Sequence, residues 1–220
     1  MQKLMCKEVI EATNGVLLSG NPNIEFLNIS TDSRKISSGD LFIPIVGEKF
    51  DGHNFIEEAL TAGAIGILTE KDLDLQSNKV IIKVEDTLKS LGDIASFYRN
   101  KFDIPIIAVT GSVGKTSTKD MIASVLSEEF NILKTQGNFN NEIGLPLTIL
   151  NMNESYQAVV VEMGMRGFGE IAYLSHVASP NVAVITNIGL SHIERLGSRQ
   201  NILKAKMEII EGLNKKGLLV

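Results

Sequence analysis

The hydrophobic positions of the first hundred residues alternate between short apolar runs and helical spacing. Apolar residues recur at helical spacing in Asn54–Ala62, and Asp86 is a candidate N-cap for a helix that ends near Tyr98. Short runs rich in β-branched residues predict strands at residues 28–31, 41–45, 64–69 and 80–84. This region therefore predicts a small α/β domain.

Longer apolar runs follow the polar segment Asn100–Asp103. Runs that suit buried strands occupy residues 104–109, 158–162 and 182–186, and a more polar strand is expected at 131–135. Helices are expected between them, at residues 115–129, 143–150, 169–178 and 198–213. This alternation predicts a mainly parallel sheet with helices on both faces.

We therefore expect an α/β chain with one domain at residues 1–100 and a second at 101–220. The last residues, Gly217–Val220, are typical of a strand that has just begun. Because a doubly wound sheet would normally continue, we expect the second domain to be incomplete.

Composition and charge narrow the possible partners. The net charge of −5 argues against a general nucleic-acid binder, which would carry a basic face. The single cysteine, Cys6, excludes an internal disulfide. The N-terminus has no apolar core of signal-peptide length, and no apolar run approaches the roughly 20 residues that span a bilayer. We expect a cytoplasmic protein without membrane insertion, and a monomer.

The segment Gly111–Thr116, with the sequence GSVGKT, lies between a predicted buried strand and a predicted helix. Glycines allow backbone N–H groups to face phosphate oxygens, and the helix N-terminus adds positive potential. Lys115 can reach the outer phosphates, and the Thr116 hydroxyl can bind magnesium. The longer eight-residue pattern would require glycine at position 109, where this chain has Val109. The alternative is a glycine-rich turn with an exposed lysine.

Glu162 and His192 each follow or end a predicted parallel strand, at the edge where open α/β sheets bind ligands. With a phosphate loop on the same edge, Glu162 is a candidate magnesium ligand; the alternative is an acid paired with Arg166. From its position alone, His192 is predicted to be a loop histidine without a special role.

An amide cluster, Asn138, Asn140 and Asn141, precedes the predicted helix at 143–150. Capping of that helix accounts for one asparagine but not for all three. Lys204 and Lys206 lie on one predicted helix, and the spacing alone predicts that both are solvated charges.

The order of these motifs resembles that of the Mur ligases, which build the peptide stem of bacterial cell-wall precursors. Within that family the motifs look most like the member that adds D-alanyl-D-alanine to UDP-N-acetylmuramoyl-tripeptide. The segments that carry the resemblance cover essentially the whole chain: Asp32–Arg34, Gly47–Phe55, Thr110–Lys119, Gly137–Pro146, Glu162–Gly167 and Asn187–Ser198.

The resemblance implies an ATP- and magnesium-dependent ligase. ATP phosphorylates the carboxylate of the UDP-linked tripeptide, and the amine of D-alanyl-D-alanine attacks the resulting acyl phosphate. By resemblance, Lys115, Glu162, His192 and Lys206 are catalytic. Those that bind metal are Thr116, Glu162, His192 and Lys206, the lysine as a carbamate. The remaining contacts to ATP are expected from Gly111, Ser112, Gly114, Ser117, Asn140, Asn141 and Asn187.

In the first domain, the resemblance implies that the UDP precursor is bound by Ser33, Arg34, Gly47, Asp51 and His53. A guanidinium suits a diphosphate, although Arg34 can equally form a surface salt bridge. Residues Asp51–His53 can equally form a tight Asx turn. The family's third domain, which helps to hold ATP and the dipeptide, has no counterpart in these 220 residues.

Other functions remain as alternatives. One is the sibling ligase that adds the third stem residue, whose loop usually reads Asn-Gly-Lys where this chain has Val113-Gly114-Lys115. Folate polyglutamylation enzymes share the central domain but lack a UDP-binding first domain. A GTPase switch would need a guanine-binding Asn-Lys-x-Asp stretch, and Asn100–Asp103 precedes the phosphate loop. A non-catalytic UDP-sugar-binding module or fragment is the last alternative.

Overall fold

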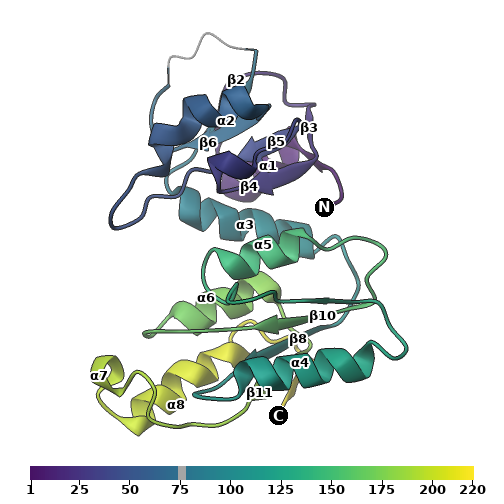
Figure 1. Ribbon diagram of the computed structural model, residues 1–220, viewed down its shortest axis with the longest axis vertical. Helices are drawn as coiled ribbons and strands as arrows, with labels where there is room; N and C mark the ends of the chain where they lie inside the picture. Colours follow the sequence, from purple (N-terminus) through teal and green to yellow (C-terminus); the bar gives the residue numbers. More distant parts are fainter. Residues whose placement is uncertain (74–77) are drawn as a thin grey trace. The chain divides into compact units, whose positions relative to one another are not determined.

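The computed structural model describes residues 1–73 and 78–220, which form two compact units (Figure 1). The first unit spans Met1–Phe97 and the second Tyr98–Val220. Each unit is built on its own five-stranded sheet with helices packed against it. The predicted α/β class is therefore confirmed.

The sheet of the first unit is mixed. Its strand order is β2-β7-β6-β5-β4; neighbours from β4 to β7 are parallel, and β2 is antiparallel to β7. A separate antiparallel pair joins β1 to β3. The strands are β1 Leu4–Met5, β2 Val16–Ser19, β3 Glu25–Phe26, β4 Asn28–Ser30, β5 Asp40–Phe42, β6 Gly66–Thr69 and β7 Val80–Lys83.

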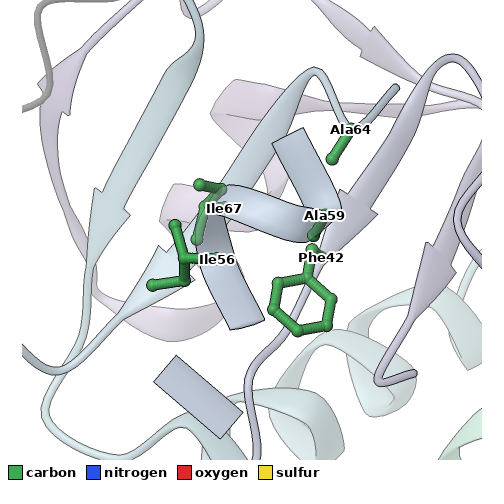
Figure 2. Packing of buried hydrophobic residues seen from close by; sticks show 5 residues of the cluster. All are labelled: Phe42, Ile56, Ala59, Ala64 and Ile67. Atoms are coloured by element: carbon green, nitrogen blue, oxygen red, sulfur yellow. The ribbon is translucent and has the colours of Figure 1, made fainter. Parts of the chain in front are cut away.

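Helix α2 packs onto this sheet through a small apolar core (Figure 2). Ala59 of α2 is directed towards Phe42 of β5, and Ile56 and Ile67 lie beside them. All of these side chains are buried, so the core holds α2 against β5 and β6. The helices of this unit are α1 Cys6–Thr13, η1 Ser33–Lys35, η2 Gly52–Phe55, α2 Ile56–Ala62 and α3 Thr87–Arg99.

The strands predicted in this unit are present, with differences at their ends. Strand β5 stops at Phe42 rather than at Ile45, because Pro44 has no N–H to continue the ladder. Asp86 does cap α3, since its Oδ1 accepts a hydrogen bond from the Lys89 N–H at 2.8 Å. Helix α1 and strands β1 to β3 were not predicted, because each is short and weakly patterned.

The sheet of the second unit is entirely parallel, as predicted. Its order is β12-β11-β8-β10-β9, so β8 lies at the centre between β10 and β11. The carboxyl ends of these strands meet at one edge, where open α/β sheets bind their ligands. The strands are β8 Ile106–Thr110, β9 Ile132–Lys134, β10 Ala158–Glu162, β11 Val182–Ile185 and β12 Leu218–Leu219.

Helices cover both faces of this second sheet. Helix α4 packs against β8, β9 and β10, whereas α5 and α6 lie on the other side (Figure 1). The predicted helix at 198–213 is shorter than expected, since α8 ends at Met207 and a 3-10 turn, η3, follows. The helices are α4 Lys115–Leu126, α5 Gly144–Leu150, α6 Glu170–Ala178, α7 Ile193–Leu196, α8 Arg199–Met207 and η3 Glu208–Ile210.

No helix in residues 1–73 and 78–220 is both long and apolar enough to cross a membrane.

The last turn of α3 belongs to the second unit and is fixed there by hydrogen bonds. The buried Arg99 guanidinium donates to three backbone carbonyls, those of Ala178 at 3.1 Å, Phe102 at 2.7 Å and Ile104 at 3.2 Å. The Tyr98 hydroxyl donates to the Met152 carbonyl at 2.6 Å. These bonds tie the segment before β8 to the ends of α5 and α6.

We predict that Arg99→Met destabilises the chain by about 2–4 kcal/mol, because several buried carbonyls lose a charged donor. Urea unfolding followed by circular dichroism measures this difference. The exposed Arg195 provides the matched control, and Arg195→Met should change the free energy of unfolding by less than about 0.5 kcal/mol. Equal effects of the two substitutions would contradict this account of Arg99.

Candidate functional site

The phosphate loop connects β8 to α4 at the centre of the second sheet. Gly111 and Gly114 both have positive φ, +152° and +81°, which favours glycine. A Cβ at Gly111 would collide with Oγ1 of Thr186, whereas one at Gly114 would meet no atom within 4 Å. The N–H groups of the first turn of α4 have no intrahelical acceptor. The loop therefore presents backbone donors beside open space, an arrangement that suits an anion.

Three segments meet at the carboxylate of Glu162, at the end of β10. Glu162 Oε2 accepts a hydrogen bond from the Thr116 hydroxyl at 2.8 Å, and its Oε1 accepts one from the Asn140 amide at 2.8 Å. The side chain is only 3% exposed. Arg166 is not its partner, because its guanidinium pairs with Glu142 at 3.3 Å. The alternative in which Glu162 pairs with Arg166 is therefore excluded.

A cavity of about 210 Å³ is lined by Asn140, the residue whose amide binds this carboxylate. It brings together four residues predicted from the sequence, Lys115, Asn140, Asn141 and His192, with Lys206 as the fifth. The Lys115 ammonium donates to the Gly111 carbonyl at 2.9 Å, within the loop itself. His192 begins the short helix α7 in a left-handed backbone conformation, with φ +63°. The remaining lining residues are Gly164, Met165, Arg166 and Glu170.

Lys206 is buried, contrary to the expectation from spacing alone. Its side chain is 1% exposed, and no hydrogen bond or ion pair to it occurs in the described part of the chain. Burial, together with the smaller effect of the nearby charge of Lys115, lowers the pKa of Lys206 from 10.5 to about 8. The neighbouring Lys204 is exposed. Helix packing therefore separates two lysines that the sequence could not distinguish.

The asparagines of the amide cluster make different contacts. Asn141 Oδ1 accepts from the Gly144 N–H at 2.9 Å and caps α5, whereas Asn140 binds Glu162. Asn187 uses its amide on the phosphate loop: its Oδ1 accepts from the Val113 N–H at 3.2 Å, and its Nδ2 donates to the Val113 carbonyl at 3.0 Å. Ser117 lies exposed in the first turn of α4.

The donor set at Glu162 suits magnesium better than a transition metal. Among residues 1–73 and 78–220, no three His, Cys, Asp or Glu side chains gather closely enough to hold a metal ion by themselves. The Thr116 hydroxyl and the Glu162 carboxylate are hard oxygen donors that already touch. Magnesium commonly takes one or two protein oxygens and completes its shell with phosphate and water. These residues therefore fit a nucleotide-bound magnesium ion.

A second cavity, of about 390 Å³, lies in the first unit. Ser33 and Arg34 line it, together with Asp32, Glu58 and a group of aromatic residues, Phe42, Phe50 and Phe55. The Arg34 guanidinium forms a bidentate ion pair with Asp32, at 2.8 and 2.9 Å. This pair raises the pKa of Arg34 and lowers that of Asp32.

Gly47, Asp51 and His53, predicted to contact the same ligand, lie outside the lining of this cavity. Asp51 forms the alternative Asx turn, in which its Oδ1 accepts from the His53 N–H at 2.9 Å and lies 2.6 Å from His53 Nδ1. His53 is buried, and its Nε2 accepts from the Glu70 N–H at 3.1 Å. Lys71, at 2.6 Å, is the main reason that the pKa of Asp51 lies far below its usual range. Both side chains are committed to the turn, because protein atoms already occupy their polar groups.

Sequence reasoning missed Arg166 and Glu170 as cavity-lining residues. Both follow Glu162 within eight residues, so their position just after the carboxyl end of β10 could have indicated that they lie near the site. It also missed Thr186, whose hydroxyl donates to the Val113 carbonyl at 2.7 Å.

Comparison with protein families agrees with this arrangement. The family described as Mur ligase middle domain matches residues 109–220, just over half of the chain. The chain belongs to the Mur ligase family. A second model of the same family, described as Mur ligase family, catalytic domain, matches residues 25–99.

Individual members of the Mur ligase family match most or all of the chain. The UDP-N-acetylmuramoyl-tripeptide–D-alanyl-D-alanine ligase of Bacillus subtilis is 46% identical over 224 residues, which cover 100% of this chain and 49% of that protein. A crystal structure of MurF from Acinetobacter baumannii has a TM-score of 0.94 at 35% identity; the match covers 100% of this chain and 48% of that one. MurF from Thermotoga maritima in complex with ADP has a TM-score of 0.81 at 38% identity; the match covers 87% of this chain and 44% of that one. The chain thus spans about half the length of the relatives it matches.

We predict a pH dependence of stability from Lys206. Because folding lowers its pKa from 10.5 to about 8, the folded chain releases this proton at lower pH than the unfolded chain does. Folding stability should therefore rise between about pH 8 and pH 10, by on the order of 2 kcal/mol. Urea unfolding in bicarbonate-free buffer at pH 7 and pH 10 measures the rise.

Lys206→Met should remove this rise, whereas the exposed Lys204→Met should retain it. A Lys206→Met chain whose stability still rises as in the unsubstituted chain would contradict the assignment to Lys206.

Proposed function

We propose that the chain is the substrate-binding and ATP-binding part of an ATP-dependent amide ligase. The ligase joins D-alanyl-D-alanine to the carboxylate of UDP-N-acetylmuramoyl-tripeptide through an acyl phosphate. The observation that carries the proposal is the convergence, at one edge of a parallel sheet, of the phosphate loop, the Thr116–Glu162 pair and the cavity lined by Lys115, His192 and Lys206. The names of the relatives supply the substrates, since relatives covering the whole chain bear this activity.

Lys115 is the group that we assign to the outer phosphates. In the structure its ammonium rests on the Gly111 carbonyl, 2.9 Å away, at the mouth of the cavity. A lysine that exchanges this neutral acceptor for a phosphate oxygen gains a charge-assisted bond. Phosphoryl transfer depends mainly on positioning and on fixed positive charge, both of which Lys115 provides from the first turn of α4.

Thr116 and Glu162 would hold magnesium. When bound, the ion neutralises charge on the phosphates and orients them for transfer. Asn140 keeps the Glu162 carboxylate in place through its 2.8 Å hydrogen bond, so the metal-binding oxygen is oriented in advance.

Lys206 is suited to become a carbamate. Its amine is buried without an anionic partner, and its lowered pKa raises the fraction of neutral amine that can react with carbon dioxide. The ammonium first releases one proton; the neutral amine then forms the Nζ–C bond with carbon dioxide as one C=O π bond opens, and a second proton leaves the nitrogen, so a cation becomes an anion. The product would place negative charge beside Lys115 and His192, where with His192 it can support a second metal ion.

The first unit would bind the UDP end of the precursor in the cavity beside Ser33 and Arg34. The Arg34 guanidinium is 80% exposed in its side chain and can leave Asp32 to contact a diphosphate. Asp51 and His53 would act indirectly, because the turn that they stabilise places Phe50 and Gly52 in the cavity lining.

Two alternatives differ in the substrates they require. The sibling ligase would transfer a diamino acid to a dipeptide precursor, and its solved relative is only 18% identical to this chain. A GTPase would prefer guanine nucleotides. Phosphate release with each substrate pair, and competition among ATP, GTP and UDP, separate these functions. A loop that binds GTP more tightly than ATP would exclude the ligase.

We also propose that the protein acts in the cytoplasm as a monomer and without nucleic acid. The buried free thiol of Cys6 and the net charge of −5 support this part of the proposal.

For the nucleotide site, we predict that Lys115→Ala weakens binding of magnesium-ATP about 10- to 100-fold, the equivalent of one charge-assisted hydrogen bond. Isothermal titration calorimetry measures the dissociation constant. Binding of UDP should stay unchanged, because its cavity lies in the other unit. Lys204→Ala is the control, since Lys204 is exposed and outside the cavity lining. ATP binding that is insensitive to Lys115→Ala would argue against the proposed role of the loop.

For Lys206, we predict a carbamate signal in the ¹³C NMR spectrum of the chain in ¹³C-bicarbonate at about pH 8. The signal should vanish in Lys206→Met and persist in Lys204→Met. A signal of equal size in both variants would assign the modification to another amine.

A further inference from the structure

Five hydrogen bonds join residues 112–113 of the phosphate loop to residues 186–189 after β11. Two of them fix Ser112: its N–H donates to the Asn187 carbonyl at 3.1 Å, and its Oγ accepts from the Gly189 N–H at 2.9 Å. The other three fix Val113. The two segments are 73 or more positions apart in sequence, so this contact exists only in the folded unit.

The backbone of Val113 is held entirely by two side chains from this neighbouring segment. Its carbonyl accepts from the Thr186 hydroxyl at 2.7 Å and from the Asn187 amide at 3.0 Å, while its N–H donates to Asn187 Oδ1 at 3.2 Å. Thr186 also lies directly against Gly111, where its Oγ1 fills the space that a Cβ would need. The middle of the loop is therefore clamped while Gly114 remains open.

A clamp of this kind reduces the conformational freedom of the loop before any ligand arrives. A free glycine-rich loop would have to lose backbone entropy on binding, at a cost in affinity. Here the peptide groups of Ser112 and Val113 are already bonded, so the donors of Gly114 and of the first turn of α4 stay aligned.

We propose that Thr186 and Asn187 are positioning residues that hold the phosphate loop in its binding shape. Asn187 acts through Val113, because its amide bonds both the N–H and the carbonyl of that residue; this role differs from the direct ATP contact expected from the sequence. The same segment continues to His192, so the clamp also connects the phosphate loop to a second residue of the cavity lining. This inference rests on the proposed binding of ATP to the loop.

The test compares Thr186→Val, which keeps the shape and removes the hydroxyl, with Thr186→Ser, which keeps the hydroxyl. Magnesium-ATP affinity is measured by calorimetry on the 220-residue chain. We expect Thr186→Val to bind about fivefold more weakly, the loss of one hydrogen bond, and Thr186→Ser to bind within about twofold of the unsubstituted chain. Asn187→Ala, at an exposed position, should lose about tenfold or more because it removes two hydrogen bonds.

Hydrogen exchange of the Val113 amide reports on the clamp itself. Asn187→Ala should speed this exchange, while the Val160 amide in the core of the sheet and the melting temperature stay unchanged. Thr61→Val, on the exposed face of α2, controls for the threonine-to-valine change and should alter neither readout.

Thr186→Val that binds ATP like the unsubstituted chain would overturn the proposal. So would Thr186→Ser binding as weakly as Thr186→Val, because the hydroxyl would then not be responsible. Absence of ATP binding in the unsubstituted chain would instead remove the proposed function, and with it this inference.

Discussion

The arrangement of the second unit depends on the carboxylate at the end of β10. Glu162 receives the Thr116 hydroxyl from the phosphate-loop helix and the Asn140 amide from the loop before α5. Its own N–H donates to the Thr135 hydroxyl at 3.0 Å, beyond the last residue of β9. One buried acid at the end of β10 therefore connects the segments that follow β8 and β9. Because a buried carboxylate is costly unless its oxygens are paired, these partners stabilise the fold.

Two lysines line the cavity without an ion pair to either ammonium in the described part of the chain. The charge of Lys115 contributes to the lowered pKa of Lys206, whereas Arg166, which lines the same cavity, is paired with Glu142. Uncompensated charge at a buried position opposes folding, so its presence here indicates a site that is stabilised by anions. The phosphates of a nucleotide and a carbamate on Lys206 are anions of the kind that the proposed reaction would supply.

In the first unit, the turn at residues 51–53 uses its polar side chains for contacts within the protein. Asp51 binds His53 and Lys71, and His53 in turn binds the backbone at Glu70. These contacts consume the polar atoms that resemblance assigned to the substrate. The residues of this region that line the cavity are instead Gly52 and the aromatic Phe50.

Local pattern was sufficient for much of this protein. The apolar runs determined the strands of the two five-stranded sheets except β2, and the GSVGKT segment between a buried strand and a helix determined the phosphate loop, because these features depend on neighbours in the chain. The pattern did not predict that β5 ends before Pro44, nor that the last helix divides into α8 and η3. Burial of Lys206 and exposure of Lys204 were decided by helix packing, since spacing alone presented both as solvated. The partners of Glu162, Asn187 and Thr186 were likewise decided by tertiary structure, because those hydrogen bonds join residues more than 20 positions apart.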